Sequence, residues 1–368
     1  MASLDGLRGV AALVVVAFHF LSAFAPGVVP HWSAQYPGWV ASPVSLLFNG
    51  ELAVSVFFVL SGFVLAASSL RPRRHLARDG VLRFVRLALP ATASVVLAWC
   101  LLSAWPTAAM TLAVRSPGPW LGYTAQAPLP PFGAAVYEGL VGVFTRGHAR
   151  FNNVLWTMRY ELLGSLALFA LFHLVRVRRW PVAWALCAVL ACAPIHKAYL
   201  CFCLGALLLL AGERGWAPGA RLSVLAVLVA VVLATPWSGL APLMLQSAWP
   251  PALRPELQNG LLYPLVAVVL VAAAMHLPGW RRALSTPMAA WLGRQSFPIY
   301  LVHVPLLYTA AATAAVRFDA LDGGRLVLLF VAYLAGTVAL AVAFERAVDA
   351  PVLRLCARVK ARSSGNGQ

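Results

Sequence analysis

The chain has 368 residues, of which 61% are hydrophobic and only 11% are charged, and its mean hydropathy is +0.82. A soluble globular domain does not have this composition, so the sequence predicts a membrane protein with several spans. The net charge of +17 therefore indicates membrane topology rather than binding to nucleic acid, because the basic residues gather between apolar segments.

Ten apolar segments are long enough, or nearly so, to cross a bilayer as helices. They are 6–26, 49–70, 87–106, 153–175, 182–195, 198–212, 222–237, 259–277, 295–316 and 325–345. With the N-terminus in the cytoplasm, about 20 of the 28 basic residues fall in inner segments and about seven in outer loops. We therefore expect an all-α bundle of about ten transmembrane helices with both termini cytoplasmic. The membrane domain would cover 1–350 and a basic cytoplasmic tail 351–368.

The first apolar segment contains an arginine and a histidine, Arg8 and His19. An ionisable side chain in such a segment usually faces a protein interior or a watery cavity, because exposure to lipid is costly. On an α-helix the two residues share one face, about 16 Å apart along the axis. This stripe fits an anionic ligand that reaches from the membrane surface toward a general base. The alternatives are that Arg8 only sets the membrane topology at the interface and that His19 is a hydrogen-bonded core residue.

The segment 153–175 begins with a polar motif, WTMRYELLGS, which contains Trp156, Arg159 and Glu161. If this helix runs inward, Glu161 lies about 12 Å below its outer end, at a depth similar to that of His19. A carboxylate at this depth would orient the histidine and stabilise its imidazolium. Arg159 is two residues away and points to another part of the helix surface. The alternative is that Glu161 belongs to a structural ion pair.

A basic stretch, RPRRHLARDGVLRFVR, precedes the third apolar segment and contains six arginines. Such stretches often only set topology and contact anionic lipids. Arg83 and Arg86 nevertheless lie three residues apart on one helix face, at the mouth of the segment. Together with Arg8 they predict a clamp that binds phosphate groups through charge-assisted hydrogen bonds.

The segment 295–316 carries a tyrosine, a histidine and two prolines in the sequence SFPIYLVHVP. Tyr300 and His303 are three residues apart, so their side chains can meet on a helix. Pro298 and Pro305 predict a kinked helix, whose freed backbone groups neighbouring side chains or water must satisfy. A plain packing role for this motif is the alternative to a role in the site.

Smaller features complete the pattern. Glu51, at the outer end of 49–70, is a weaker site candidate that would line an external mouth, and Gly62 in FFVLSGF predicts close helix packing.

Most cysteines lie in apolar segments, so we interpret them as small core residues rather than disulfides or metal ligands. They are Cys100, Cys187, Cys192, Cys201, Cys203 and Cys356. No metal site is expected.

These motifs follow one another in the order LDGLRG, FFVLSGF, RFVRLALP, WTMRYELLGS, IYLVHVP and FERAVDAPVLRL, with ten residues between Arg8 and His19. Their order and spacing resemble those of the integral-membrane acyltransferase family 3, over nearly the whole chain. The resemblance implies a ten-helix bundle that takes acyl groups from cytoplasmic acyl-CoA, with Arg8 and His19 engaged in donor binding and catalysis. It also implies that Glu161 is the acidic residue of the family's Trp-x-x-x-x-Glu motif and that Arg83 and Arg86 form its basic loop.

The resulting hypothesis is an O-acyltransferase of the inner or plasma membrane. It moves an acyl group, acetyl by resemblance, from acyl-CoA, a donor substrate rather than a bound cofactor, to a hydroxyl of a cell-surface or exported glycan. His19 would accept the hydroxyl proton and Glu161 would orient His19. Many family members have a small or neutral residue where Arg159 stands, so contacts to the acceptor are expected to differ. Two alternatives stay open: a small glycosylated natural product as the acceptor, and a transporter without chemistry.

Overall fold

The computed structural model describes residues 1–33, 35–70, 75–115, 120, 128–147, 149–178, 196–236, 258–318 and 321–365. Within these ranges the chain is helical and forms no strand, which confirms the expected all-α class. Six of the described helices are long and apolar enough to cross a membrane: Ala2–Phe24, Gly50–Ser69, Leu76–Ala104, Asn153–His173, Pro287–Val316 and Gly323–Arg362. The bent pair Gly260–His276 and Pro278–Leu284 adds a seventh if it forms one span. The number of about ten spans and the cytoplasmic termini stay predictions.

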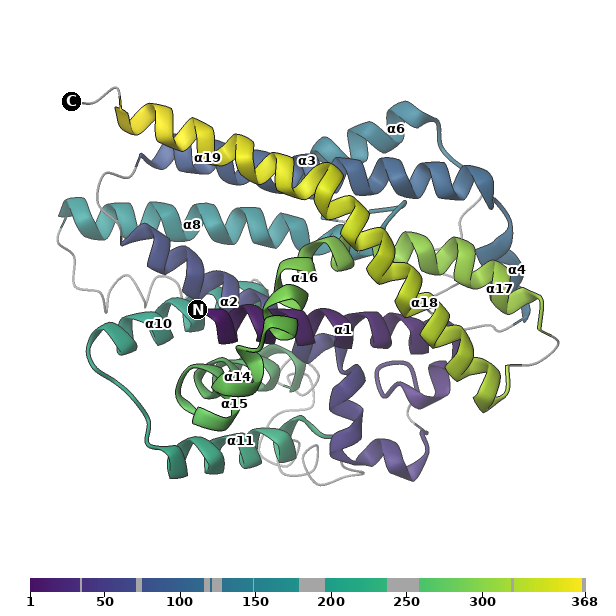
Figure 1. Ribbon diagram of the computed structural model, residues 1–368, viewed down its shortest axis with the longest axis horizontal. Coiled ribbons are helices and arrows are strands. Elements are labelled where there is room, and N and C mark those ends of the chain that lie inside the picture. Colours follow the sequence, from purple (N-terminus) through teal and green to yellow (C-terminus); the bar gives the residue numbers. More distant parts are fainter. Residues whose placement is uncertain are drawn as a thin grey trace. The chain divides into compact units, whose positions relative to one another are not determined.

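The helices of the described ranges are shown in Figure 1. In chain order they are α1 (Ala2–Phe24), α2 (Gly50–Ser69), α3 (Leu76–Ala104), α4 (Ala108–Arg115), α6 (Phe132–Tyr137), α7 (Val143–Thr145), α8 (Thr157–Arg178), α10 (Lys197–Glu213), α11 (Ala220–Ala234), α14 (Tyr263–His276), α15 (Pro278–Leu284), α16 (Pro287–Leu306), α17 (Ala312–Val316), α18 (Gly323–Phe344) and α19 (Ala350–Gly365). Short 3-10 segments are η1 (Pro26–Val28), η2 (Gly38–Ala41), η3 (Pro43–Phe48) and η5 (Asn153–Trp156). Short π-helical segments are η4 (Glu138–Gly142), η7 (Gln258–Leu262), η8 (Leu307–Ala311) and η9 (Glu345–Asp349).

Most of the predicted segments correspond to a helix. The segment 182–195 lies outside the described residues. The segments 198–212 and 222–237 correspond to α10 and α11, which have 17 and 15 residues. Because a straight span needs about 20 residues, these two helices are shorter than the hydrocarbon core is thick.

The chain divides into two compact units, which are described separately below. The first unit contains Met1–Phe18, Gly27–Leu76 and Leu163–Ser296, and the second contains His19–Pro26, Ala77–Leu162 and Phe297–Gln368. The boundaries fall inside α1, η1, α3, α8 and α16.

In the first unit, α2 packs against α10 and α14, and α14 also packs against α11. Two glycines set the distance between α2 and α10. A methyl group at Gly62 would overlap the backbone of Phe202, and one at Gly205 would overlap the backbone of Val59. The two helices therefore touch backbone to backbone, which confirms the packing role predicted for Gly62.

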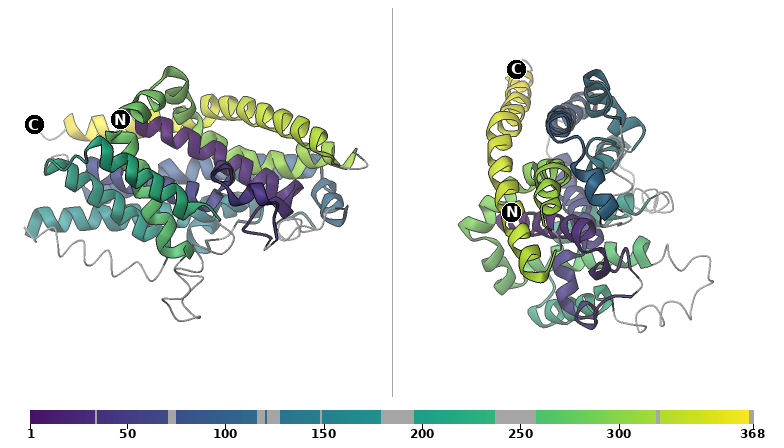
Figure 2. Two further views of the ribbon diagram at one scale, coloured as in Figure 1. Left: turned by 90° about the horizontal axis from the view of Figure 1, so that it is seen from below. Right: turned by 90° about the vertical axis from the view of Figure 1, so that its right-hand side faces the viewer.

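In the second unit, α18, η9 and α19 form one continuous helical run, which Figures 1 and 2 show from three sides. The final helix lies beside the start of α3, where Leu82 packs with Val352 and Cys356 in a small apolar cluster. Cys356 is buried, as are Cys201 and Cys203 in the first unit, whereas Cys100 is exposed. The core interpretation thus holds for three of the four described cysteines.

The prolines of α16 leave backbone carbonyls that other groups must satisfy. Pro305 has no N–H, so the carbonyl oxygen of Leu301 loses its helical donor. Ser94 Oγ of α3 donates to this oxygen at 2.7 Å, and Asn152 Nδ2, just before η5, donates to it at 2.8 Å. Both side chains are fully buried. These side chains confirm that neighbours satisfy the broken helix, and they fix α16 against α3 and the start of α8.

Candidate functional site

His19 lies beside a second histidine, His303 of α16, in the second unit. The Nε2 atom of His303 lies 3.1 Å from Nδ1 of His19, and the ring centroids are 5.1 Å apart. The indole of Trp120 lies on His19 as well, at a centroid distance of 5.3 Å. His303 is fully buried, whereas His19 is half-buried. The structure therefore holds the His19 ring between an imidazole and an indole, with part of its surface accessible.

Tyr300 and Tyr333 fix the position of His303. The rings of Tyr300 and His303 have centroids 6.0 Å apart, so these residues meet as predicted. The Tyr300 hydroxyl donates to the carbonyl oxygen of Val154 and lies 2.6 Å from Thr157 Oγ1. The Tyr333 hydroxyl of α18 donates to the backbone carbonyl of His303 at 3.0 Å. Hydrogen bonds from α8, α16 and α18 thus converge around this histidine.

Glu161 forms an ion pair with Arg83. The distance between Arg83 Nη2 and Glu161 Oε2 is 2.5 Å, and the side chains are 20% and 12% exposed. The sequence proposed Glu161 as the partner of His19 and Arg83 as a phosphate ligand. The structure instead joins the two candidates to one another, which favours the alternative of an ion pair for Glu161.

Arg86, one turn along α3, forms a second and bidentate ion pair. Its Nη1 and Nη2 atoms lie 2.5 and 3.3 Å from the two carboxylate oxygens of Asp349, and its guanidinium lies 5.0 Å from the centre of the Phe297 ring. Asp349 is almost fully buried in η9. Sequence reasoning did not single out this carboxylate, although it lies in the motif FERAVDAPVLRL.

Arg8 lies in the first unit, where the start of α1 packs tightly on α15 and α16. A methyl group at Gly6 would overlap the backbone of Leu284, and one at Gly9 would overlap that of Gly293. The Arg8 side chain is half-buried, and no ion pair with a described residue involves it. Because Arg83 belongs to the other unit, the predicted three-arginine clamp stays a prediction.

The other polar residues of the Trp156 motif face different neighbours. The Trp156 ring packs on Tyr160 at a centroid distance of 5.7 Å. The Arg159 side chain lies against the turn at Gly147, where φ is 72° and where an added Cβ would come within 3.0 Å of Arg159 Cδ. Arg159 and Glu161 therefore have different surroundings, as their spacing predicts.

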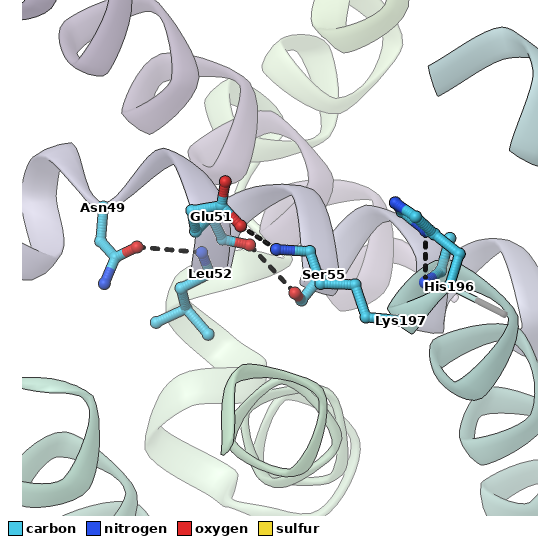
Figure 3. A network of polar contacts seen from close by, with 7 residues as sticks. Asn49, Glu51, Leu52, Ser55, His196 and Lys197 are labelled. Carbon is cyan, nitrogen blue, oxygen red and sulfur yellow. Dashed lines mark hydrogen bonds and ion pairs between the residues drawn. The ribbon is translucent and has the colours of Figure 1, made fainter. Parts of the chain in front are cut away.

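Glu51 pairs with Lys197 in the first unit (Figure 3). Lys197 begins α10, where the helix dipole disfavours a cation, so the carboxylate offsets this cost. The start of α2 is fixed as well, because Asn49 Oδ1 accepts from Leu52 N at 2.9 Å and Ser55 Oγ donates to the Glu51 carbonyl at 2.9 Å. This geometry favours a structural role for Glu51 at two helix ends.

The surroundings of two histidines near this pair favour their neutral forms. Burial lowers the pKa of His196, whose Nδ1 caps α10 by accepting from Ala198 N at 3.1 Å. Burial, and then the charge of Lys197, lower the pKa of His31. The ring of His31 packs edge-on against Phe18, the residue that precedes His19, at a centroid distance of 6.1 Å.

Comparisons with known proteins show the family to which the chain belongs. Residues 1–346 match the family model described as the acyltransferase domain of family 3. The chain is 28% identical to an O-acetyltransferase, PaAT-1, of Phomopsis amygdali over 87% of this chain and 75% of the relative. It is also 28% identical to the acyltransferase MdmB of Streptomyces mycarofaciens, over 82% of this chain and 77% of the relative. No solved structure matches the chain.

The family match covers nearly all of the helices that carry the two histidines and the two arginine pairs. A transporter without chemistry is thereby set aside, because the matched domain transfers acyl groups. The chain belongs to the acyltransferase family 3, and it is a multi-pass membrane enzyme that transfers acyl groups.

Proposed function

We propose that the enzyme moves an acyl group from acyl-CoA to an acceptor hydroxyl, with His19 as the general base. The observation that carries this proposal is the half-buried His19 ring, hydrogen-bonded to His303 inside the apolar helices of an acyltransferase. An imidazole combines a pKa near neutrality with the ability to accept and return a proton, which acyl transfer to a hydroxyl requires.

The proposed step is balanced in protons and bonds. The acceptor oxygen attacks the thioester carbonyl while His19 accepts the hydroxyl proton. The new C–O bond forms a tetrahedral intermediate, which then loses its C–S bond. The imidazolium returns the proton to the sulfur, so the products are an ester and free coenzyme A, and His19 is neutral again.

The arginines are proposed to bind the phosphates of the donor. Arg8 supports this role because it is half-buried and has no ion pair with a described residue. Arg83 and Arg86 are proposed to contact phosphate through their guanidinium groups, each of which carries five N–H donors. We propose that Glu161 acts through Arg83 by fixing the direction of its guanidinium, rather than by contacting His19.

The acyl group is proposed to be acetyl, and the acceptor a hydroxyl of a cell-surface or exported glycan. The similarity to PaAT-1, which is named as an O-acetyltransferase, supports both acetyl transfer and an oxygen acceptor. A small glycosylated natural product is the second acceptor class. The bias of basic residues supports cytoplasmic termini in an inner or plasma membrane, so the donor would enter from the cytoplasm.

The test uses the purified full chain in lipid nanodiscs with acetyl-labelled coenzyme A. Labelled ester formed from candidate sugars, together with free coenzyme A, supports the proposal, and His19→Ala should abolish both products. His75→Gln replaces an exposed histidine and serves as the matched control. Full activity in His19→Ala would remove the role assigned to His19. Mass spectrometry of surface glycans from cells with and without the protein identifies the acceptor class.

A further inference from the structure

His303 is a buried histidine with two directed hydrogen bonds. None of its surface is exposed. Its Nδ1 atom lies 3.0 Å from the carbonyl oxygen of Ile299, one turn earlier on α16, and its Nε2 atom lies 3.1 Å from Nδ1 of His19. Each ring nitrogen of His303 therefore faces a defined neighbour.

These contacts determine which nitrogen atoms carry protons. A carbonyl oxygen can only accept, so the contact with Ile299 requires a proton on Nδ1 of His303. A neutral imidazole with Nδ1–H has its lone pair on Nε2, which must then accept from His19. The donor in that contact is Nδ1–H of His19, and the lone pair of neutral His19 is consequently on its Nε2 atom.

From this chain of contacts we infer that His303 is a positioning residue that holds His19 in the Nδ1–H tautomer and makes Nε2 the atom that accepts the proton. The inference rests on the proposed function, because it assigns His303 a task in the step that His19 performs. In that step the acceptor proton moves to His19 Nε2 as the C–O bond forms, and returns to the sulfur as the C–S bond breaks. His303 gains and loses no proton, and its Nε2 lone pair accepts a charge-assisted bond from the transient imidazolium.

A carboxylate has this task in many catalytic triads, where it orients the base and stabilises its charged form. A backbone-anchored imidazole does the same with no net charge. Two contacts fix the position of His303, because the Tyr333 hydroxyl donates to its backbone carbonyl at 3.0 Å and Tyr300 packs on its ring. The Nδ1–H bond to Ile299 is part of the same helix, so the orientation of the ring does not depend on substrate.

Two substitutions separate this task from simple packing. His303→Leu fills similar space without an acceptor for His19, and we expect kcat to fall about 100-fold while KM for acyl-CoA changes little. His303→Gln places an amide oxygen near the position of Nε2, so it should restore most of that loss. His75→Gln, at an exposed position, controls for the change of residue type. Equal activity of the Leu variant and the wild type would overturn the inference, as would a Gln variant no better than a folded Leu variant.

A measurement on the unaltered enzyme covers the case in which the Leu variant does not fold. Solid-state NMR of protein labelled with 13C,15N-histidine in lipid distinguishes protonated from unprotonated ring nitrogens, and the His19 signals are those missing in His19→Gln. We expect a protonated Nδ1 and an unprotonated Nε2 on His19. The opposite tautomer would overturn the inference. Failure of the proposed function itself has a different signature, namely full activity of His19→Ala.

Discussion

Neutral substitutions at Arg83 and Glu161 distinguish two roles for the carboxylate. If Glu161 acts through Arg83, Arg83→Gln and Glu161→Gln should each raise KM for acyl-CoA about tenfold, the lower end expected for one charge-assisted hydrogen bond. Adding Glu161→Gln to Arg83→Gln should then change KM little, because the group that Glu161 orients is already gone. If Glu161 instead orients His19, Glu161→Gln should lower kcat by the same factor in the wild type and in Arg83→Gln.

The stability of the same variants tests the ion pair itself. Breaking a buried pair by removing one partner costs about 3–5 kcal/mol, whereas an exposed pair contributes about 0–1 kcal/mol. The side chains of Arg83 and Glu161 are 20% and 12% exposed, which places them between these limits. We therefore expect each single variant to lose about 2 kcal/mol of folding stability. The double variant should lose less than the sum, because neither charge is left unpaired.

The assay is a double-mutant cycle on purified protein, with thermal unfolding and labelled acetyl-CoA turnover measured on the same samples. The second pair of α3, Arg86→Gln and Asp349→Asn, is the matched control one helical turn away. Mixed variants that combine one residue from each pair should depart from additive losses of stability by less than the Arg83–Glu161 double variant does, because the two pairs share no partner. Additive effects on KM and stability within the Arg83–Glu161 cycle would refute the reasoning.

Three further predictions concern helix packing and pH. Gly205→Ala should lower the melting temperature, because its methyl group would overlap the α2 backbone, whereas Gly212→Ala on the same helix has open space and should stabilise by about 1 kcal/mol. Asn152→Ala should lower the free energy of unfolding by about 1–3 kcal/mol. Adding Pro305→Ala should offset part of this loss, because it restores a helical N–H donor. Thermal unfolding measures both effects, and an unchanged loss in the double variant would contradict the role of Asn152. Because burial lowers the pKa of His196, the unfolded state binds a proton first, and folding stability should fall as the pH drops below about 6.5. His196→Asn keeps a capping side chain and should flatten the pH dependence of the melting temperature. An unaltered pH profile in this variant would contradict the prediction.

Local patterns in the sequence predicted the parts of the site that depend on neighbours within one helix. The spacing of Tyr300 and His303 predicted their contact, and the small residue Gly62 predicted close packing. Pro305 predicted an unsatisfied carbonyl. In each case the period of the helix or the chemistry of one residue type determines the outcome, so no knowledge of the tertiary fold is needed.

Contacts between distant segments were not predictable in the same way. His19 and His303 are 284 residues apart in the chain, and Arg86 and Asp349 are 263 apart. The sequence placed Glu161 within an apolar segment and Arg83 at the mouth of another, but it could not show that each was the partner of the other. A helix pattern gives the face on which a side chain lies, whereas the partner depends on which helices pack together.

The choice of partners has a physical consequence for His19, the proposed base. In the described part of the second unit, Glu161 and Asp349 are each bonded to an arginine, so their charges are balanced in the resting enzyme. If His19 contacted an unpaired buried carboxylate instead, the desolvation cost of that charge would be present throughout and not only during the reaction. In the proposed step the His19–His303 pair has no net charge until the acceptor proton arrives, so the cost of a buried ion would arise only during that step. We expect this arrangement to keep His19 neutral before the hydroxyl binds, which is the state in which a general base is active.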